Sequence, residues 1–167
     1  MKKLLITLLF GFFFMITCTK LFGATTINPD TSACLEIEGK ILNAMDGDGT
    51  CLVELIGSES TLQSLVLKDG KKKFAFKLRK NQNYTIRLSK IGYISKSISI
   101  DTRINKAYDD LYLFAFDTKM ISLVEGDKLN KELIKQPVAL IYFDVRQGCF
   151  NYNKAYMARM KKELASN

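Results

Sequence analysis

The stretch 73-KFAFKLRKNQNYTIRLSK-90 decides the fold class of this chain. Apolar and polar residues alternate from Phe74 to Leu78, and they alternate again from Tyr84 to Leu88. Alternation with a period of two is typical of a strand that buries one face. The polar residues 81–83 between the two runs favour a turn. The stretch therefore predicts two consecutive strands, each with one face in a hydrophobic core.

Five further runs of the same character flank this stretch. They are residues 35–41, 51–55 and 62–68 before it, and 98–100 and 111–116 after it. Turn residues separate the runs at intervals of roughly 8–12 residues, which is the spacing of an antiparallel sandwich. We therefore expect a mainly β fold, with a seven-stranded antiparallel sandwich over residues 34–117. The run 111–116 is apolar on both faces, so we expect another segment to cover its outer face.

Residues 118–167 predict a C-terminal extension that packs on this sandwich. Residues 138–143 are a strand run that is apolar on both faces, and Asn151 is placed to cap a final helix. Apolar residues recur along that helix at helical spacing: Tyr152, Ala155, Tyr156, Met160 and Leu164. Because an exposed stripe of this kind is unfavourable in water, we expect the strand and the amphipathic helix to pack against the sheets.

The first 23 residues have the layout of a secretory signal peptide. Lys2 and Lys3 precede an apolar run from Leu4 to Ile16, which is the order of charge and apolar core that directs export. The run is shorter than the roughly 20 residues that a membrane-spanning helix needs. We expect residues 1–23 to be removed, and the rest of the chain to reach the periplasm, the outer membrane or the cell surface.

Two processing sites compete at the end of this leader. Met15-Ile16-Thr17-Cys18 resembles a bacterial lipobox, which would make Cys18 a lipidated first residue. Thr17 departs from that pattern, because a small Gly, Ala or Ser normally precedes the cysteine. The alternative is ordinary cleavage after Gly23 or Ala24, which are small residues of the kind that signal peptidase requires. The sequence leaves both processing sites open. The mature protein could therefore be either soluble or anchored by a lipid.

The composition narrows the chemistry that the chain can perform. It has 25 basic and 17 acidic residues, a net charge of +8, and no histidine. Histidine is the commonest general base near neutral pH and the commonest zinc ligand, so its absence argues against an enzyme. The sequence also lacks a phosphate-binding glycine loop, a G-x-S-x-G motif and a C-x-x-C pair. We expect no catalytic residue and no cofactor, with a small carboxylate-dependent hydrolase as the alternative.

Three cysteines remain if Cys18 is lost with the leader: Cys34, Cys51 and Cys149. An oxidising compartment permits a disulfide, but three cysteines cannot all pair within one chain. The positions of the first two strand runs make a bridge between Cys34 and Cys51 geometrically awkward. We expect buried free thiols that pack as small apolar groups.

One loop and one charged stretch are candidate binding sites. Asp46-Gly47-Asp48-Gly49-Thr50 resembles the start of a calcium loop, but Gly57 stands at the twelfth position, where such a loop needs glutamate. A plain turn is therefore favoured, and Asp46 and Asp48 are weak metal candidates. The basic residues from Lys71 to Lys90 favour a solvated sheet face that protects an edge. Contact with anionic lipid or acidic glycan is the alternative, since export argues against nucleic acid.

The remaining polar candidates favour structural roles. Tyr142, Tyr152 and Tyr156 allow an aromatic platform for a sugar, but their strand and helix spacing favours core packing. Asp101 and Asp109-Asp110 are acidic, but they are not associated with any nucleophile pattern.

Five short motifs occur in the order of a known domain: IEGKI at 37–41, CLVEL at 51–55, FAFKL at 74–78, YTIRL at 84–88 and KIGY at 90–93, the last followed by Ile98-Ser99-Ile100. In this order, the stretch from Ile37 to Thr102 resembles the carboxypeptidase-regulatory-like domain, a transthyretin-like (prealbumin-like) β-sandwich. The turn that this family usually forms before its fourth strand, Asp-x-x-Gly-x-Phe, is altered. Here three lysines are inserted after Asp69-Gly70 and before Phe74.

This resemblance implies an accessory or binding module and supplies no catalytic residues. In that family, the domain accompanies metallocarboxypeptidase catalytic domains or precedes outer-membrane receptors. We therefore expect an exported, non-enzymatic accessory module of the bacterial cell envelope. Its expected partners are envelope proteins or a cell-surface glycan, without nucleic acid, and with membrane contact only through a lipid anchor. The alternative is a carbohydrate- or calcium-binding β-sandwich.

Overall fold

The computed structural model describes residues 33–43, 49–58, 60–68, 71–105, 110–126 and 129–165. Over these ranges the chain is mainly β, with several sheets and a C-terminal helix, α3 (Lys154–Ala165). Two four-residue helices, α1 (Leu123–Gly126) and α2 (Lys131–Ile134), precede the last two strands. The coarse prediction of a mainly β fold with a final helix is therefore confirmed.

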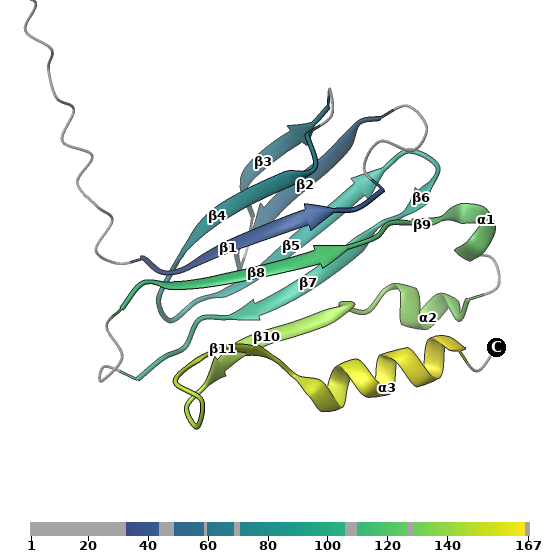
Figure 1. Ribbon diagram of the computed structural model, residues 1–167. Coiled ribbons are helices and arrows are strands. Elements are labelled where there is room, and N and C mark those ends of the chain that lie inside the picture. The colour runs from purple at the N-terminus through teal and green to yellow at the C-terminus, as the bar shows by residue number, and fades with distance from the viewer. Residues whose placement is uncertain are drawn as a thin grey trace, which may run out of the picture.

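Two sheets carry most of the described chain (Figure 1). The smaller sheet has the order β4-β1-β8, formed by β4 (Lys73–Arg79), β1 (Ala33–Ile41) and β8 (Tyr112–Thr118). The larger sheet has the order β11-β10-β7-β5-β2-β3, formed by β11 (Cys149–Tyr152), β10 (Ala139–Asp144), β7 (Lys96–Asp101), β5 (Asn83–Lys90), β2 (Cys51–Ile56) and β3 (Thr61–Leu67). A two-stranded sheet pairs β6 (Tyr93–Ile94) with β9 (Ile121–Ser122).

Each of the seven runs that the alternation predicted is a strand, and the expected C-terminal strand is β10. The expected antiparallel arrangement of residues 34–117 is wrong at one pairing, because β1 runs parallel to β8. The C-terminal strand β10, for which no direction was predicted, runs parallel to β7. Alternation shows which residues share a face of a strand. It carries no information about the direction of the neighbouring strand.

The C-terminal residues extend the larger sheet instead of packing on a completed one. β10 pairs with β7, and Ile141 lies opposite Ile100 in that pairing. Asn151 was predicted to cap the final helix, but it lies within β11. The cap is Asn153, whose Oδ1 accepts a hydrogen bond from the backbone N–H of Tyr156 at 3.0 Å. The antiparallel pairing of β11 with β10 keeps the chain extended for two residues beyond the predicted start of the helix.

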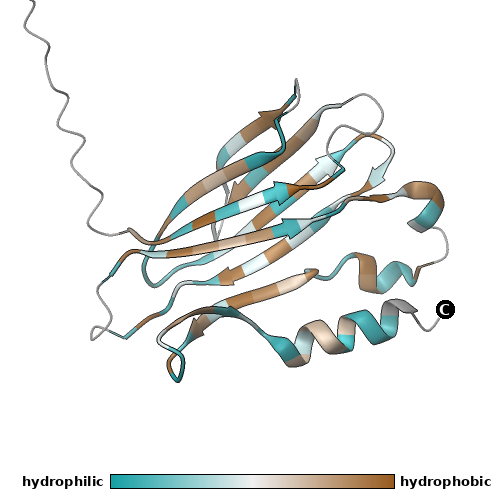
Figure 2. Ribbon diagram, viewed as in Figure 1, coloured by the Kyte–Doolittle hydropathy of each residue, from teal (hydrophilic) through white to brown (hydrophobic). Residues whose placement is uncertain are grey.

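A single hydrophobic core contains side chains from both sheets. The alternation that builds it is visible along the strands in Figure 2. The ring of Tyr112 in β8 meets Phe143 of β10 edge-on, with centroids 5.2 Å apart, and Phe114 meets Tyr152 of β11 at 5.0 Å. β10 and β11 therefore cover the inner face of β8. The prediction that a segment covers its outer face is wrong, since Leu113 there is 67% exposed.

Gly39 makes room for two phenylalanine rings at the centre of the smaller sheet. It lies opposite Phe74 of β4 and Phe116 of β8. The two rings are 6.0 Å apart between centroids and meet edge-on. A Cβ atom built on Gly39 would lie 2.1 Å from Cζ of Phe74. The position therefore requires glycine because an aromatic ring approaches the backbone closely.

The variant Gly39→Ala tests this packing. Its added methyl group overlaps the Phe74 ring in a close-packed core, so we expect the free energy of unfolding to fall by about 1–3 kcal/mol. Urea denaturation measures the change. The double variant Gly39→Ala/Phe74→Leu should recover part of the loss, because the smaller side chain leaves room for the methyl group. Equal costs with and without Phe74 would contradict the proposed overlap.

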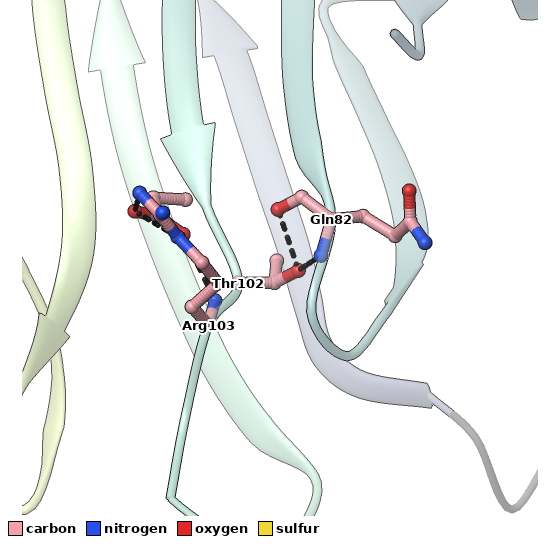
Figure 3. Close-up of polar contacts among 4 residues, drawn as sticks. Gln82, Thr102 and Arg103 are labelled. Atoms are coloured by element: carbon pink, nitrogen blue, oxygen red, sulfur yellow. Dashed lines mark hydrogen bonds and ion pairs between the residues drawn. The ribbon is translucent and has the colours of Figure 1, made fainter.

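Thr102 stabilises the connection between β4 and β5, a corner where the chain passes from the smaller sheet to the larger one. Its side chain is completely buried just beyond the end of β7. The hydroxyl oxygen accepts a hydrogen bond from the backbone N–H of Gln82 at 3.0 Å and lies 2.9 Å from the carbonyl oxygen of the same residue (Figure 3). It also donates to the carbonyl oxygen of Arg79 at 2.7 Å. Within this corner, Asn81 has a φ of 58°, a conformation that asparagine adopts more readily than most residues.

Replacing this hydroxyl tests the corner. Thr102→Val keeps the shape of the side chain but leaves the Gln82 N–H without its hydroxyl acceptor. We expect the free energy of unfolding to fall by about 1–3 kcal/mol in thermal or urea denaturation. The matched control is Thr85→Val on the half-exposed side of β5, which should change stability by less than about 0.5 kcal/mol. Equal effects of the two substitutions would argue against the corner as a stabilising feature.

Candidate functional site

An open groove of about 930 Å³ lies at the smaller sheet. We name it the sheet groove. Six of its lining residues lie on the outer side of the sheet, two from each strand: Glu38, Lys40, Lys73, Ala75, Ala115 and Asp117. The register aligns them in two rows across the sheet. Glu38 lies between Ala75 and Ala115, and Lys40 lies between Lys73 and Asp117.

The sheet groove combines small side chains with charges of both signs. Ala75 and Ala115 leave open space on both sides of Glu38, while Lys73 and Asp117 provide opposite charges on the two outer strands. Small-molecule sites usually bury most of their ligand in an enclosed, mainly apolar cavity. The width and mixed charge of this groove suit the polar surface of a larger partner instead.

Tyr152 of β11 adds a hydrogen-bonding group to the sheet groove. Its ring packs edge-on against Phe114. Burial raises the pKa of its hydroxyl, and the negative charge of Asp117 raises that pKa further. The hydroxyl therefore stays protonated throughout the physiological pH range and can donate a hydrogen bond to a partner.

Tyr142, Tyr152 and Tyr156, for which core packing was favoured over a sugar platform, do not share one surface, and Tyr142 is 38% exposed. Tyr152 lies opposite Ile141 in the pairing of β10 with β11, so the next residue, Tyr142, lies on the other face of the sheet. The hydroxyl of Tyr156 donates to the carbonyl oxygen of Pro137 at 2.6 Å. A sugar platform built from all three residues is therefore wrong, and only Tyr152 reaches the sheet groove.

The basic stretch divides into an exposed part and one buried residue. Lys73, Lys77 and Arg79 are exposed on β4, as the solvated-face interpretation predicted. The solvated-face interpretation is wrong at Lys90, which lies at the end of β5 and is only 7% exposed. Its ammonium nitrogen lies 4.2 Å from the ring centroid of Tyr93 and donates to the carbonyl oxygen of Asn43 at 3.3 Å.

The inward position of Lys90 was visible in the sequence. The residue continues the alternation of Tyr84, Ile86 and Leu88, and its long apolar stem fits an inward position when the charged end finds partners. By contrast, no motif marks Ala115 or Asp117, and the IEGKI motif that contains Glu38 and Lys40 indicated a strand and no binding role. These residues meet only through the pairing of β1 with β8.

The predicted metal and lipidation positions and the acidic residue Asp101 remain to be placed. Asp46, Asp48 and Cys18 lie outside the described residues. Among the residues that the structure describes, no three His, Cys, Asp or Glu side chains are grouped to hold a metal ion. Asp101 accepts hydrogen bonds from the Arg103 side chain, which lower its pKa (Figure 3), and this pairing gives it a structural role.

The described cysteines are free thiols, as predicted. Cys34 and Cys51 are buried, and burial raises the pKa of each thiol. A protonated thiol is a poor nucleophile, so these two residues serve as core packing groups. Cys149 is partly exposed, and the prediction of burial is wrong at that position.

No family model matches the chain, and no curated protein is similar to it in sequence at a significant level. The resemblance to the carboxypeptidase-regulatory-like domain therefore stays a prediction. None of the helices in the described part of the chain is long and apolar enough to cross a bilayer.

The protonation of Tyr152 gives a test of the groove electrostatics. Removing the charge in Asp117→Asn should lower the pKa of Tyr152, because that charge disfavours the phenolate. In the wild type the folded-state pKa lies above the unfolded one, near 10. The contribution of the protonated Tyr152 hydroxyl to the free energy of unfolding is therefore fully present below about pH 10. It is lost as the pH rises through the pKa of Tyr152 in the folded state.

An ultraviolet absorbance titration, compared with that of Tyr152→Phe, measures this pKa. Tyr156 is the internal control, because burial and Glu163 raise its pKa without a contribution from Asp117. Asp117→Asn should leave Tyr156 unchanged. A Tyr152 titration that does not respond to the substitution would show that Asp117 does not act on the hydroxyl.

Proposed function

We propose that this protein is an exported, non-enzymatic binding module of the bacterial cell envelope that holds a partner at the sheet groove. The observation that carries the proposal is the groove itself, an open surface of about 930 Å³ in which Glu38 lies between two alanines and Lys40 lies between Lys73 and Asp117. The leader at residues 1–23 supports export. Cleavage after Gly23 or Ala24 would release a soluble form, and lipidation of Cys18 would anchor the protein in the membrane.

The surroundings of the sheet groove also suit an interface. Leu113 and Leu111, at or next to the outer face of β8, are 67% and 52% exposed. Protein interfaces combine exposed apolar groups of this kind with a polar rim. A partner that covers β8 would remove these side chains from water and would also contact Asp117 and Lys40.

For the finer fold, we propose a transthyretin-like sandwich. The support is that side chains of both sheets enter one core and that every strand run within the 37–102 resemblance is a strand. On this proposal, β10, β11 and α3 are additions at one edge of the domain. An accessory role in an envelope complex is the function that this resemblance implies.

A photo-activated cross-linking amino acid placed at Ala115 in the full chain tests the function. In intact cells we expect it to form an adduct with an envelope protein, because Ala115 is exposed and lines the sheet groove. The same group at Lys161, an exposed position on α3, is the matched control and should form no such adduct.

The outcomes separate the alternatives. Binding to a glycan array that is lost in Tyr152→Ala, without a protein adduct at Ala115, would favour the carbohydrate-binding alternative. Equal labelling at Ala115 and Lys161, together with blank arrays, would reject the sheet groove as a binding site. Fractionation of the same cells tests export, which would be rejected by a cytoplasmic protein that keeps its leader.

A further inference from the structure

β3 presents an unprotected edge. It is the terminal strand of the larger sheet, so within the described residues one side of its backbone has no neighbouring strand. Six of its seven residues are exposed, and Leu62 and Val66 are 54% and 55% exposed. The strand contains no charged residue and no proline. Natural edge strands usually carry such residues to prevent pairing, so an apolar edge without them indicates a place where another strand adds.

The length of this edge is set by an irregularity near its start. The pairing of β2 with β3 shifts register between Leu55 and Ile56. From Gln63 to Leu67 the pairing is regular, which leaves a continuous edge of five residues. A strand of about that length can pair along it through backbone hydrogen bonds.

A cleft of about 540 Å³ lies beside this edge and reaches the edge strand of the smaller sheet. It is lined by Leu62 and Gln63 of β3, by Leu55 and Tyr84 of neighbouring strands, and by Lys77 and Arg79 of β4. A strand added to β3 would point alternate side chains toward this cleft. The β4 wall is basic, and the opposite wall combines Leu55 and Leu62 with the polar residues Ser58, Ser60 and Gln63.

The charge of the β4 wall decides which strand fits. A second copy paired through its own β3 would extend the same sheet and bring its own Lys77 and Arg79 toward those of the first copy. Like charges in such an arrangement repel. An acidic strand would instead place its carboxylates beside these two side chains. Lys73, Lys77 and Arg79 are the only charged residues on β4, and all are basic and exposed.

We propose that the β3 edge binds an extended acidic segment of a partner protein, which adds to the larger sheet as a further strand beside Lys77 and Arg79. Backbone hydrogen bonds to β3 would provide the pairing, and the basic wall would select negative charge. This site is separate from the sheet groove and does not depend on what binds there.

Two seven-residue peptides test the proposal on the full chain without its leader. One is acetyl-Thr-Glu-Val-Glu-Val-Glu-Thr-amide, and the other carries lysine in place of glutamate. Fluorescence anisotropy of labelled peptides should show binding of the glutamate peptide at least about tenfold tighter than that of the lysine peptide, weakening as salt rises. Hydrogen exchange should show new protection of the backbone amides in Thr61–Leu67 when the glutamate peptide is present.

The charge-removing variant is Lys77→Gln/Arg79→Gln. It keeps the backbone contacts of Arg79 and should weaken binding of the glutamate peptide by about tenfold or more. The matched control, Lys161→Gln/Lys162→Gln, removes the same charge from the exposed side of α3 and should leave binding unchanged. An effect of equal size in both variants would mean that net charge, rather than the β4 wall, attracts the peptide, and it would overturn the proposal.

Three further results would overturn it. One is equal affinity for the two peptides, and another is no binding of either. The third is a dimer in sedimentation, with the amides of β3 already protected without peptide, which would assign the edge to a second copy. Cross-linking at Ala115 probes a different surface, so failure here leaves the sheet-groove proposal to its own test.

Discussion

The pairing register around Gly39 is the constraint on which the rest of the smaller sheet depends. Gly39 lies between Phe74 and Phe116, and the Phe74 ring occupies the space that a side chain at this position would need. Because side chains alternate between faces, this register also aligns the outward residues of the three strands. A slip of one residue would move the rings to the outer face and the groove residues into the core. The same contact therefore packs the interior and builds the candidate site outside.

The two edges of the larger sheet differ in what covers them. β10 and β11 extend the larger sheet beyond β7, and their aromatic rings pack on the inner face of β8. The C-terminal residues thus complete the core on one side of the molecule. On the opposite side, β3 is the last strand of this sheet among the described residues, and its Leu62, Leu65 and Val66 are exposed while Leu67 is buried. The two sides of the larger sheet therefore differ, and the β3 edge is the one that we propose binds another chain.

The role of each basic residue depends on whether its side chain lies on the inner or the outer face of its strand. Lys90 faces inward, where the Tyr93 ring and the Asn43 carbonyl partly replace its contact with water. Lys77 faces outward and forms only a 4.0 Å pair with Glu36, in which both side chains keep contact with solvent. Exposed pairs of this kind contribute little stability. Lys77 therefore stays on the surface, whereas Lys90 is part of the core.

The sequence alone determined the mainly β class and the positions of seven strands, because a two-residue period reports burial directly. It also contained the signal for the inward Lys90. Only the tertiary structure decided that β1 runs beside β8 and that β11 replaces the first turn of the predicted helix. The sheet groove belongs to this second class. Its residues are distant in sequence, and periodicity carries no information about which strands become neighbours or in which direction they run.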